Sequence, residues 1–212
     1  MSIFIELVCS GNTDRIREYF EESVDQVASL EIFLNKRDER GKTPLDYAAM
    51  LGREETLKYL IENGANPNSH STRGYTALHH AASWGHLNCV KILANCGTDL
   101  LMRNANGEFA RDVAARYEKK DCVEFLKRAE AIASLRKAIK NIKGLLTDPE
   151  KNLGRLNKED KVTGNKFCDE KNIWLMTHKD TASVELILRK KDELYESLRK
   201  VFIKLQYLDE FT

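Results

Sequence analysis

Three histidines and a cysteine lie within the stretch GYTALHHAASWGHLNC at positions 74–89. Histidine nitrogen and cysteine sulfur are common metal ligands, and both residue types also serve in nucleophilic catalysis. His79 and His80 are adjacent, so on a helix they would point about 100° apart and could not easily hold one ion. No ligand set here has the spacing of a closed metal site, and the chain has no glycine-rich phosphate loop or nucleophile elbow. The sequence therefore predicts a protein that is not an enzyme, with no catalytic, metal or cofactor site.

The composition of the chain narrows its class further. Its 212 residues include 34 basic and 33 acidic side chains, so it has none of the strong positive charge that nucleic-acid binding normally requires. The five cysteines are odd in number and include no CxxC pair, which favours free thiols in a reducing compartment. The apolar N-terminal stretch is interrupted by Glu6 and is too short for a signal or membrane segment. These features predict a cytoplasmic protein that binds no nucleic acid and does not insert into a membrane.

An internal repeat of 33 residues organises the middle of the chain. It relates three sets of glycines and one set of paired alanines: Gly41, Gly74 and Gly107; Gly52 and Gly85; Gly64 and Gly97; Ala48-Ala49, Ala81-Ala82 and Ala114-Ala115. With this period, the segments TPLDYA and TALHHA resemble the T-P-L-H-x-A pattern of the ankyrin repeat family. That resemblance implies a solenoid in which each unit is a turn followed by two antiparallel helices.

The ends of the repeat array depart from the pattern. The segment IELVCSGNTDRIREYF resembles the helix pair of a degenerate capping repeat, and an insertion at residues 23–38 separates it from the first full unit. The third unit carries Phe109 in place of threonine and Glu118 in place of the middle glycine. Apolar positions of the second helices are expected to close each layer: Leu57, Leu60, Ile61, Val90, Leu93, Val123 and Leu126.

The repeat offers a structural interpretation of the histidines and the cysteine. His79 occupies the histidine position of the pattern, where the resemblance implies hydrogen bonds to neighbouring turns. His86 follows the glycine between two helices, a common choice in ankyrin repeats. Cys89 lies one period before Cys122, which predicts a small buried core position.

The C-terminal third follows a different pattern, with helical periodicity in place of the repeat. An apolar stripe runs from Leu135 to Leu146, Asn157 and Asp160 suit a helix N-terminus, and a helix at residues 183–206 carries apolar residues at three-four spacing. These helices predict a small three-helix bundle centred on Trp174; the alternative is a last helix that stands free until a partner binds. The segments LNKEDK, FCDEKNIWL, KKDEL and VFIKL are similar to the helical lid of 70-kilodalton heat-shock chaperones.

The predicted fold class is all-α, an ankyrin-repeat solenoid followed by a small C-terminal three-helix bundle. We expect a degenerate N-terminal capping repeat and insertion at residues 1–37, three ankyrin repeats at 38–128 and the chaperone-lid-like bundle at 129–212.

The turn tips and the end of each first helix are the positions that the fold leaves free, and they predict a protein-binding surface. Leu51, Trp84 and Tyr117 recur at 33-residue spacing, and an apolar-aromatic row flanked by arginines has the composition of a binding hot spot. The alternative is that Trp84 covers a helix end or packs on the C-terminal region. The predicted binding residues are Arg40, Lys42, Met50, Leu51, Arg73, Tyr75, Ser83, Trp84, Asn106, Glu108, Arg116 and Tyr117.

These observations predict a non-enzymatic adaptor or scaffold that binds proteins through its concave repeat face and a C-terminal helical module. One alternative is a chaperone accessory, and another is a structural component of a cytoskeletal, ciliary or cell-division assembly. Its partner would then be a heat-shock chaperone or a cytoskeletal protein. The ordered segments RGYTALHHAASWG, ARDVAARY, CVEFL and KEDK resemble proteins that join ankyrin repeats to a lid-like segment. That resemblance implies association with cilia, the midbody or the cleavage furrow.

Overall fold

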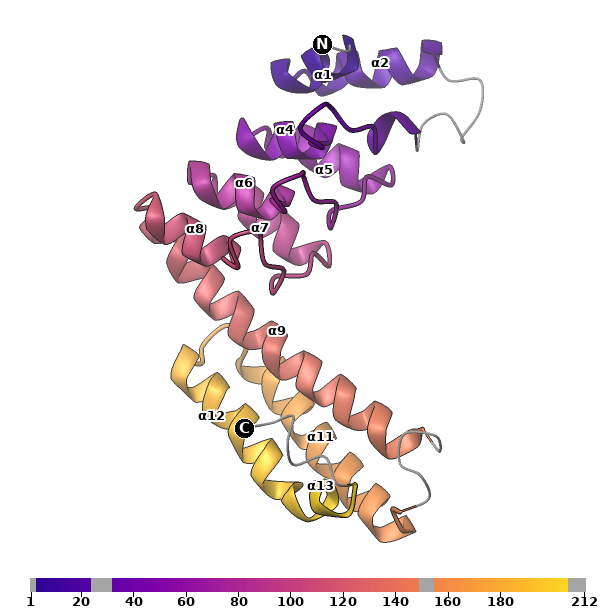
Figure 1. Ribbon diagram of the computed structural model, residues 1–212, viewed down its shortest axis with the longest axis vertical. Helices are drawn as coiled ribbons and strands as arrows, with labels where there is room; N and C mark the ends of the chain where they lie inside the picture. The colour runs from indigo at the N-terminus through magenta and orange to yellow at the C-terminus, as the bar shows by residue number, and fades with distance from the viewer. Residues whose placement is uncertain (1–2, 24–31, 149–154, 206–212) are drawn as a thin grey trace. The chain divides into compact units, whose positions relative to one another are not determined.

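The computed structural model describes residues 3–23, 32–148 and 155–205, and helices joined by turns account for most of them (Figure 1). The chain divides into two compact units, residues 1–127 and 128–212. The all-α fold class is confirmed. No helix in the described ranges is long and apolar enough to cross a membrane.

The first unit is a stack of helix pairs (Figure 1). First helices contact first helices along the stack, in the order α1, α4, α6 and α8, and the second helices α2, α5 and α7 do the same. The helices are α1 (Ile3–Ser10), α2 (Thr13–Ser23), α4 (Pro44–Met50), α5 (Glu54–Glu62), α6 (Ala77–Trp84), α7 (Leu87–Asn95), α8 (Ala110–Arg116) and α9 (Lys120–Thr147). The capping pair, α1 and α2, therefore joins the repeats in one solenoid, while α9 begins in the third repeat and continues past residue 128.

Capping boxes start the first helices of the first two repeats. The hydroxyl of Thr43 accepts a hydrogen bond from the amide of Asp46 at 3.3 Å, and a carboxylate oxygen of Asp46 accepts one from the amide of Thr43 at 2.8 Å. Thr76 and His79 repeat this exchange in α6, with Nδ1 of His79 as the acceptor. A helix start is thus encoded in each threonine of the repeat pattern.

The third repeat begins without a threonine, and only half of the capping box is kept. The carboxylate of Asp112 still accepts from the amide of Phe109 at 3.0 Å. The phenyl ring lies under the guanidinium of Arg103, 4.0 Å from ring centroid to Cζ. At the other departure from the pattern, Glu118 adopts a positive φ of 57°, the conformation that glycine holds in the earlier repeats.

The core of the solenoid is made of the alanines of the first helices and the apolar residues of the second helices. Ala48, Ala49, Ala81, Ala82 and Ala114 are fully buried, as are Leu57, Leu60, Val90, Leu93 and Leu126. Each buried leucine stabilises the fold by roughly 1.5–3 kcal/mol. Cys89 and Cys122 are buried one repeat apart, which confirms the prediction that they are core residues. Ala115 is exposed. It lies on α8, and no further first helix of the described residues packs on that side.

Backbone hydrogen bonds tie the turn tips of successive repeats together. The amide of Thr72 donates to the carbonyl of Arg40 at 3.1 Å, and one repeat later the amide of Ala105 donates to the carbonyl of Arg73 at 3.0 Å. Gly74 makes this approach possible because it has a φ of +73° and because a Cβ there would lie 2.7 Å from the amide nitrogen of Ala105. The tips are therefore held in register.

The second unit contains the C-terminal part of α9 with α11 (Lys158–His178), α12 (Val184–Ser197) and α13 (Arg199–Leu205). Its core includes Leu135, Ile139, Ile142, Leu146, Cys168, Leu175, Ile187, Leu194, Leu198 and Phe202. Asn157 and Asp160 form the capping box that starts α11, as predicted from the sequence. Gly164 lets α11 lie close to α9, since a Cβ there would be 2.6 Å from a methyl carbon of Leu146.

Two predictions about the second unit are wrong in detail. The expected single last helix at residues 183–206 is broken at Leu198, a buried residue that ends α12 before α13 begins. The break lets Phe202 reach the same core, where its ring lies 5.9 Å from that of Tyr195. The core is not centred on Trp174, because its indole is only partly buried and stacks on His178 at 5.3 Å. Cys168 and Leu175 occupy the centre of α11's buried face instead.

Candidate functional site: a groove across the repeat tips

A hollow of about 610 Å³ runs between the turn tips and the first helices of the repeats. Seven of the twelve predicted binding residues line it: Arg40, Lys42, Arg73, Tyr75, Ser83, Trp84 and Tyr117. Glu39, Ser71, Thr72 and His80 complete the lining. We call this hollow the groove. It draws on all three repeats, so the 33-residue period is what brings these distant positions together.

Two aromatic residues of the groove are exposed, Trp84 and Tyr117, whereas Tyr75 is half-buried. Trp84 is the last residue of α6 and Tyr117 ends α8, and their exposed fractions are 58% and 54%. Leu51, one period earlier, is 44% exposed but does not line the groove. An exposed tryptophan has large apolar area to bury, so this arrangement favours binding over the alternative that Trp84 serves as a cover.

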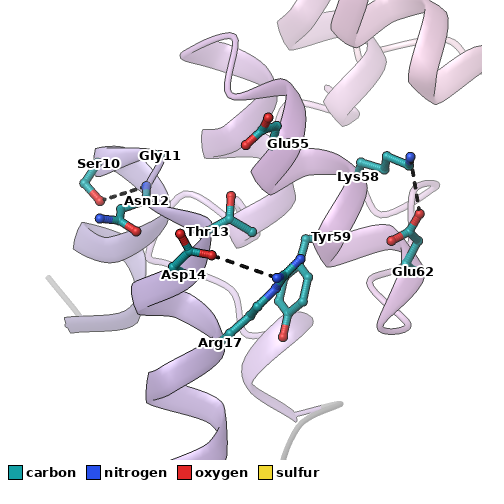
Figure 2. Close-up of a pocket in the computed structure, with 10 residues that line it drawn as sticks. All are labelled: Ser10, Gly11, Asn12, Thr13, Asp14, Arg17, Glu55, Lys58, Tyr59 and Glu62. Carbon is teal, nitrogen blue, oxygen red and sulfur yellow. Dashed lines mark hydrogen bonds and ion pairs between the residues drawn. The ribbon is translucent and has the colours of Figure 1, made fainter.

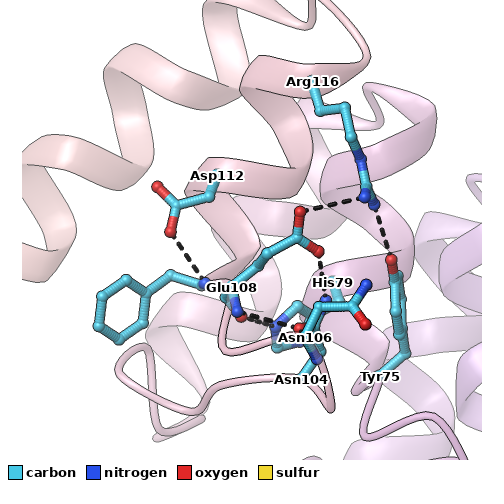
Figure 3. Close-up of polar contacts among 8 residues, drawn as sticks. Tyr75, His79, Asn104, Asn106, Glu108, Asp112 and Arg116 are labelled. Carbon is cyan, nitrogen blue, oxygen red and sulfur yellow. Dashed lines mark hydrogen bonds and ion pairs between the residues drawn. The ribbon is translucent and has the colours of Figure 1, made fainter.

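A polar network holds one wall of the groove in place (Figure 3). The carboxylate of Glu108 pairs with the guanidinium of Arg116 at 3.0 Å and accepts from the side-chain amide of Asn104 at 2.8 Å. Arg116 also donates to the hydroxyl of Tyr75 at 2.8 Å. Arg116 and Glu108 thus position Tyr75 from outside the groove. Of the other predicted residues, Met50 is half-buried and its sulfur accepts from Lys42, and Asn106 is exposed at the third tip; neither lines the groove.

His79 and His86 connect neighbouring repeats. Nε2 of His79 lies 3.2 Å from the carbonyl of Glu108 in the next repeat (Figure 3), and Nε2 of His86 lies 3.1 Å from the carbonyl of Met50 in the preceding one. The predicted hydrogen bond from His79 to a neighbouring turn is confirmed. Within the described ranges, no group of three or more histidine, cysteine or acidic side chains could hold a metal ion.

The charges of the groove are not balanced. Arg40, Lys42 and Arg73, which we call the groove cations, make no ion pair with any residue that the structure describes. His80 forms part of the lining, and burial, aided by the charge of Lys42, lowers the pKa of its imidazole to about 4. His80 is therefore neutral at pH 7. With Glu39 as the one acidic residue of the lining, the formal charge there is three minus one, or +2.

A second hollow, of about 720 Å³, lies beside the turn between α1 and α2 (Figure 2). Its cations are paired: Arg17 lies 3.9 Å from the carboxylate of Asp14, and Lys58 lies 3.8 Å from that of Glu62. Both of its cations thus have an acidic partner, unlike those of the groove, and with Glu55 as a third acid its formal charge is two minus three, or −1. None of the twelve predicted binding residues lines it.

Sequence reasoning missed four lining residues of the groove. Ser71, Thr72 and Glu39 belong to tip columns that the 33-residue period defines. The place of His80 in the lining depends on how α6 is rotated against the tips, which the period does not indicate.

Comparison with known proteins agrees with this architecture. Residues 45–94 match the family profile described as "Ankyrin repeats (many copies)". Human ankyrin repeat domain-containing protein 45 is 37% identical over 198 residues, which cover 92% of this chain and 74% of that protein. The mouse protein of the same name is 38% identical over 81 residues, or 38% of this chain and 32% of its own length.

A third relative shares only a short region. The human DNA-binding protein RFXANK is 36% identical over 63 residues, which cover 30% of this chain and 22% of that protein. Ankyrin repeats are in general a non-enzymatic fold that binds other proteins. The repeats, the capping helices and the match along nearly the whole length show that the chain belongs to the ankyrin repeat family, together with ankyrin repeat domain-containing protein 45.

Proposed function

We propose that this protein is a non-enzymatic adaptor that holds a protein partner in the groove around Trp84. The observation that carries the proposal is the pair of exposed aromatic residues Trp84 and Tyr117 at the ends of first helices, beside cations without ion pairs. Tryptophan, tyrosine and arginine are the residue types that contribute most to protein interfaces. The tip-to-tip hydrogen bonds hold the turns that carry Arg40 and Arg73 in place before a partner arrives, so little ordering entropy is lost there on binding.

Proximity labelling in cells, with quantitative mass spectrometry of the labelled neighbours, tests this proposal. The comparison is between the unaltered chain, Trp84→Ala and Ile203→Ala. Ile203 lies in the second unit with an exposed fraction of 52%, close to that of Trp84, and it lines no part of the groove. We expect neighbours that Trp84→Ala loses and Ile203→Ala retains. An identical neighbour list for all three chains would contradict the proposal.

A chaperone-accessory role is the second candidate. The sequence segments of the second unit that resemble the lid of heat-shock chaperones support it. Val162, Ile173 and Met176 on α11 are each more than half exposed, which gives this unit apolar surface of its own. In that case a 70-kilodalton heat-shock chaperone should co-purify with the chain, and added ATP should change the amount retained. We further propose a cytoplasmic location, at cilia, the midbody or the cleavage furrow, which fluorescence microscopy of the tagged protein would test.

A further inference from the structure

We infer that the groove selects an acidic segment of its partner, with one aromatic or branched apolar side chain seated against Trp84 and carboxylates beside the groove cations. The inference rests on the proposed function and names the chemistry of the partner. It is drawn from the difference between the basic side chains of the first unit that form ion pairs and those that do not.

Most other basic side chains near the two hollows already have an acidic neighbour. Arg116 is paired with Glu108 at 3.0 Å, and Arg17 and Lys58 are paired beside the second hollow. The groove cations differ, since the ammonium of Lys42 donates only to the sulfur of Met50 and sits 5.6 Å from the ring centroid of Tyr47. The charge of Lys42 acts on the nearby carboxyl groups of Asp38 and Asp46, but neither carboxylate forms an ion pair with its ammonium. A partner carboxylate would therefore meet groove cations that make no ion pair with the described residues.

The charges of the lining also disfavour a basic peptide. Three cations face one acid, Glu39, and the neutral His80 adds no charge. A basic peptide would bring like charges together, which is unfavourable at an interface. An acidic peptide gains attraction at both turn tips, while its apolar side chain covers Trp84 and excludes water around the charges.

The geometry of the stack suggests a spacing for the acidic residues. Arg40 and Arg73 occupy equivalent positions on successive tips, and the amide of Thr72 joins the two tips by its hydrogen bond to the carbonyl of Arg40. An extended chain rises about 3.3 Å per residue, and every second side chain points to the same side, about 7 Å from the last. Carboxylates two residues apart in an extended segment would therefore face both tips.

Nucleic acid is also negatively charged, but the observations favour protein. Tight binding to nucleic acid needs many phosphate contacts, whereas the groove offers three cations with Glu39 among them. The chain as a whole has a formal charge of +1, so no wider basic field supports the groove. The inference is therefore an acidic protein segment.

Selection from a random dodecapeptide library on the full-length protein tests the inference. Three further targets are selected in parallel: Trp84→Ala, the double variant Arg40→Gln with Arg73→Gln, and the control Arg17→Gln with Lys58→Gln. We expect peptides that depend on Trp84 and carry aspartate or glutamate two residues apart beside an aromatic or apolar residue. Their affinity should fall roughly fivefold to tenfold in the groove double variant and stay unchanged in the control.

Salt gives a second measurement that needs no substitution. Affinity for the selected peptides should fall as NaCl rises from about 0.05 M to about 0.5 M, because exposed charges are screened. This readout keeps the test valid even if the double variant unfolds, which circular dichroism would show.

Three results would overturn the inference. Trp84-dependent peptides without acidic residues would do so while leaving the proposed function intact. Failure to obtain any Trp84-dependent peptide would remove the acidic segment as the ligand, and the labelling experiment would still judge the adaptor role independently. A random oligonucleotide that binds more tightly than every selected peptide at physiological salt would assign the groove to nucleic acid.

Discussion

Gly74 and Gly107 occupy equivalent positions in successive turn tips, and substitution of each by alanine should separate conformational strain from repeat stacking. Their φ angles are +73° and +77°, so alanine meets the same left-handed strain at both, about 1–2 kcal/mol. The surroundings differ. At Gly107 no heavy atom lies within 4 Å of the added Cβ, whereas at Gly74 the amide nitrogen of Ala105 lies at 2.7 Å.

The extra cost at Gly74 can be worked out from this contact. The two backbones must move apart, which weakens the hydrogen bond from Ala105 to the carbonyl of Arg73, worth about 1 kcal/mol. Overpacking adds about 1–3 kcal/mol. We therefore expect Gly74→Ala to lower the free energy of unfolding by roughly 3–5 kcal/mol and Gly107→Ala by roughly 1–2 kcal/mol.

Urea unfolding of the full chain, followed by far-ultraviolet circular dichroism, measures both variants. Because Gly74 lies between Arg73 and Tyr75, Gly74→Ala should also shift the emission of Trp84, read in a Trp174→Phe background. Losses of stability for Gly74→Ala and Gly107→Ala that agree within about 0.5 kcal/mol would refute the close stacking of the tips. That is the usual range of effects at positions without a specific contact.

Three more predictions concern single positions. The pKa of His80 is about 4 in the folded chain against 6.5 when unfolded, so its stabilising contribution is present above pH 6.5 and is lost as the pH falls toward 4. Between pH 7 and pH 5, His80→Gln should therefore lose about 2 kcal/mol less stability than the unaltered chain in urea titrations. In the same assay Gly144→Ala, at an open helical site, should stabilise by up to about 1 kcal/mol, whereas Gly164→Ala, where the added methyl group meets the core, should not. Trp174→Ala should cost about 1–2 kcal/mol, less than the roughly 2–5 kcal/mol of Leu175→Ala, because only Leu175 is fully buried; equal costs would restore the tryptophan-centred core.

The repeat unit could be predicted from the sequence because its period is marked by residue types that few others can replace at those positions. Glycine is needed where φ is positive, threonine where a first helix begins, and alanine where helices approach closely. Positions that share a column share an environment inside the stack and differ at its ends, as Leu51 and Ala115 do. The period thus predicts one surface for Arg40, Arg73 and Trp84, which all line the groove.

What the sequence could not show depends on distances between side chains. Glu108 and Arg116 were both predicted to bind a partner, but they pair with each other, and no periodic pattern distinguishes a paired arginine from a free one. The break at Leu198 was missed because the three-four spacing of apolar residues continues through it. Neither glycine nor proline marks that break, so only the packing of Phe202 explains it.

The most direct test of the central claim is the affinity of the chain for a neighbour identified by the labelling experiment, measured by isothermal titration. Trp84→Ala should weaken binding by about 2 kcal/mol, or roughly thirtyfold, as expected for an aromatic anchor. Since Trp84 is 58% exposed, the substitution should leave thermal unfolding nearly unchanged. Ile203→Ala should bind as the unaltered chain does. Equal affinity for Trp84→Ala and the unaltered chain would contradict the assignment of the groove as the binding surface.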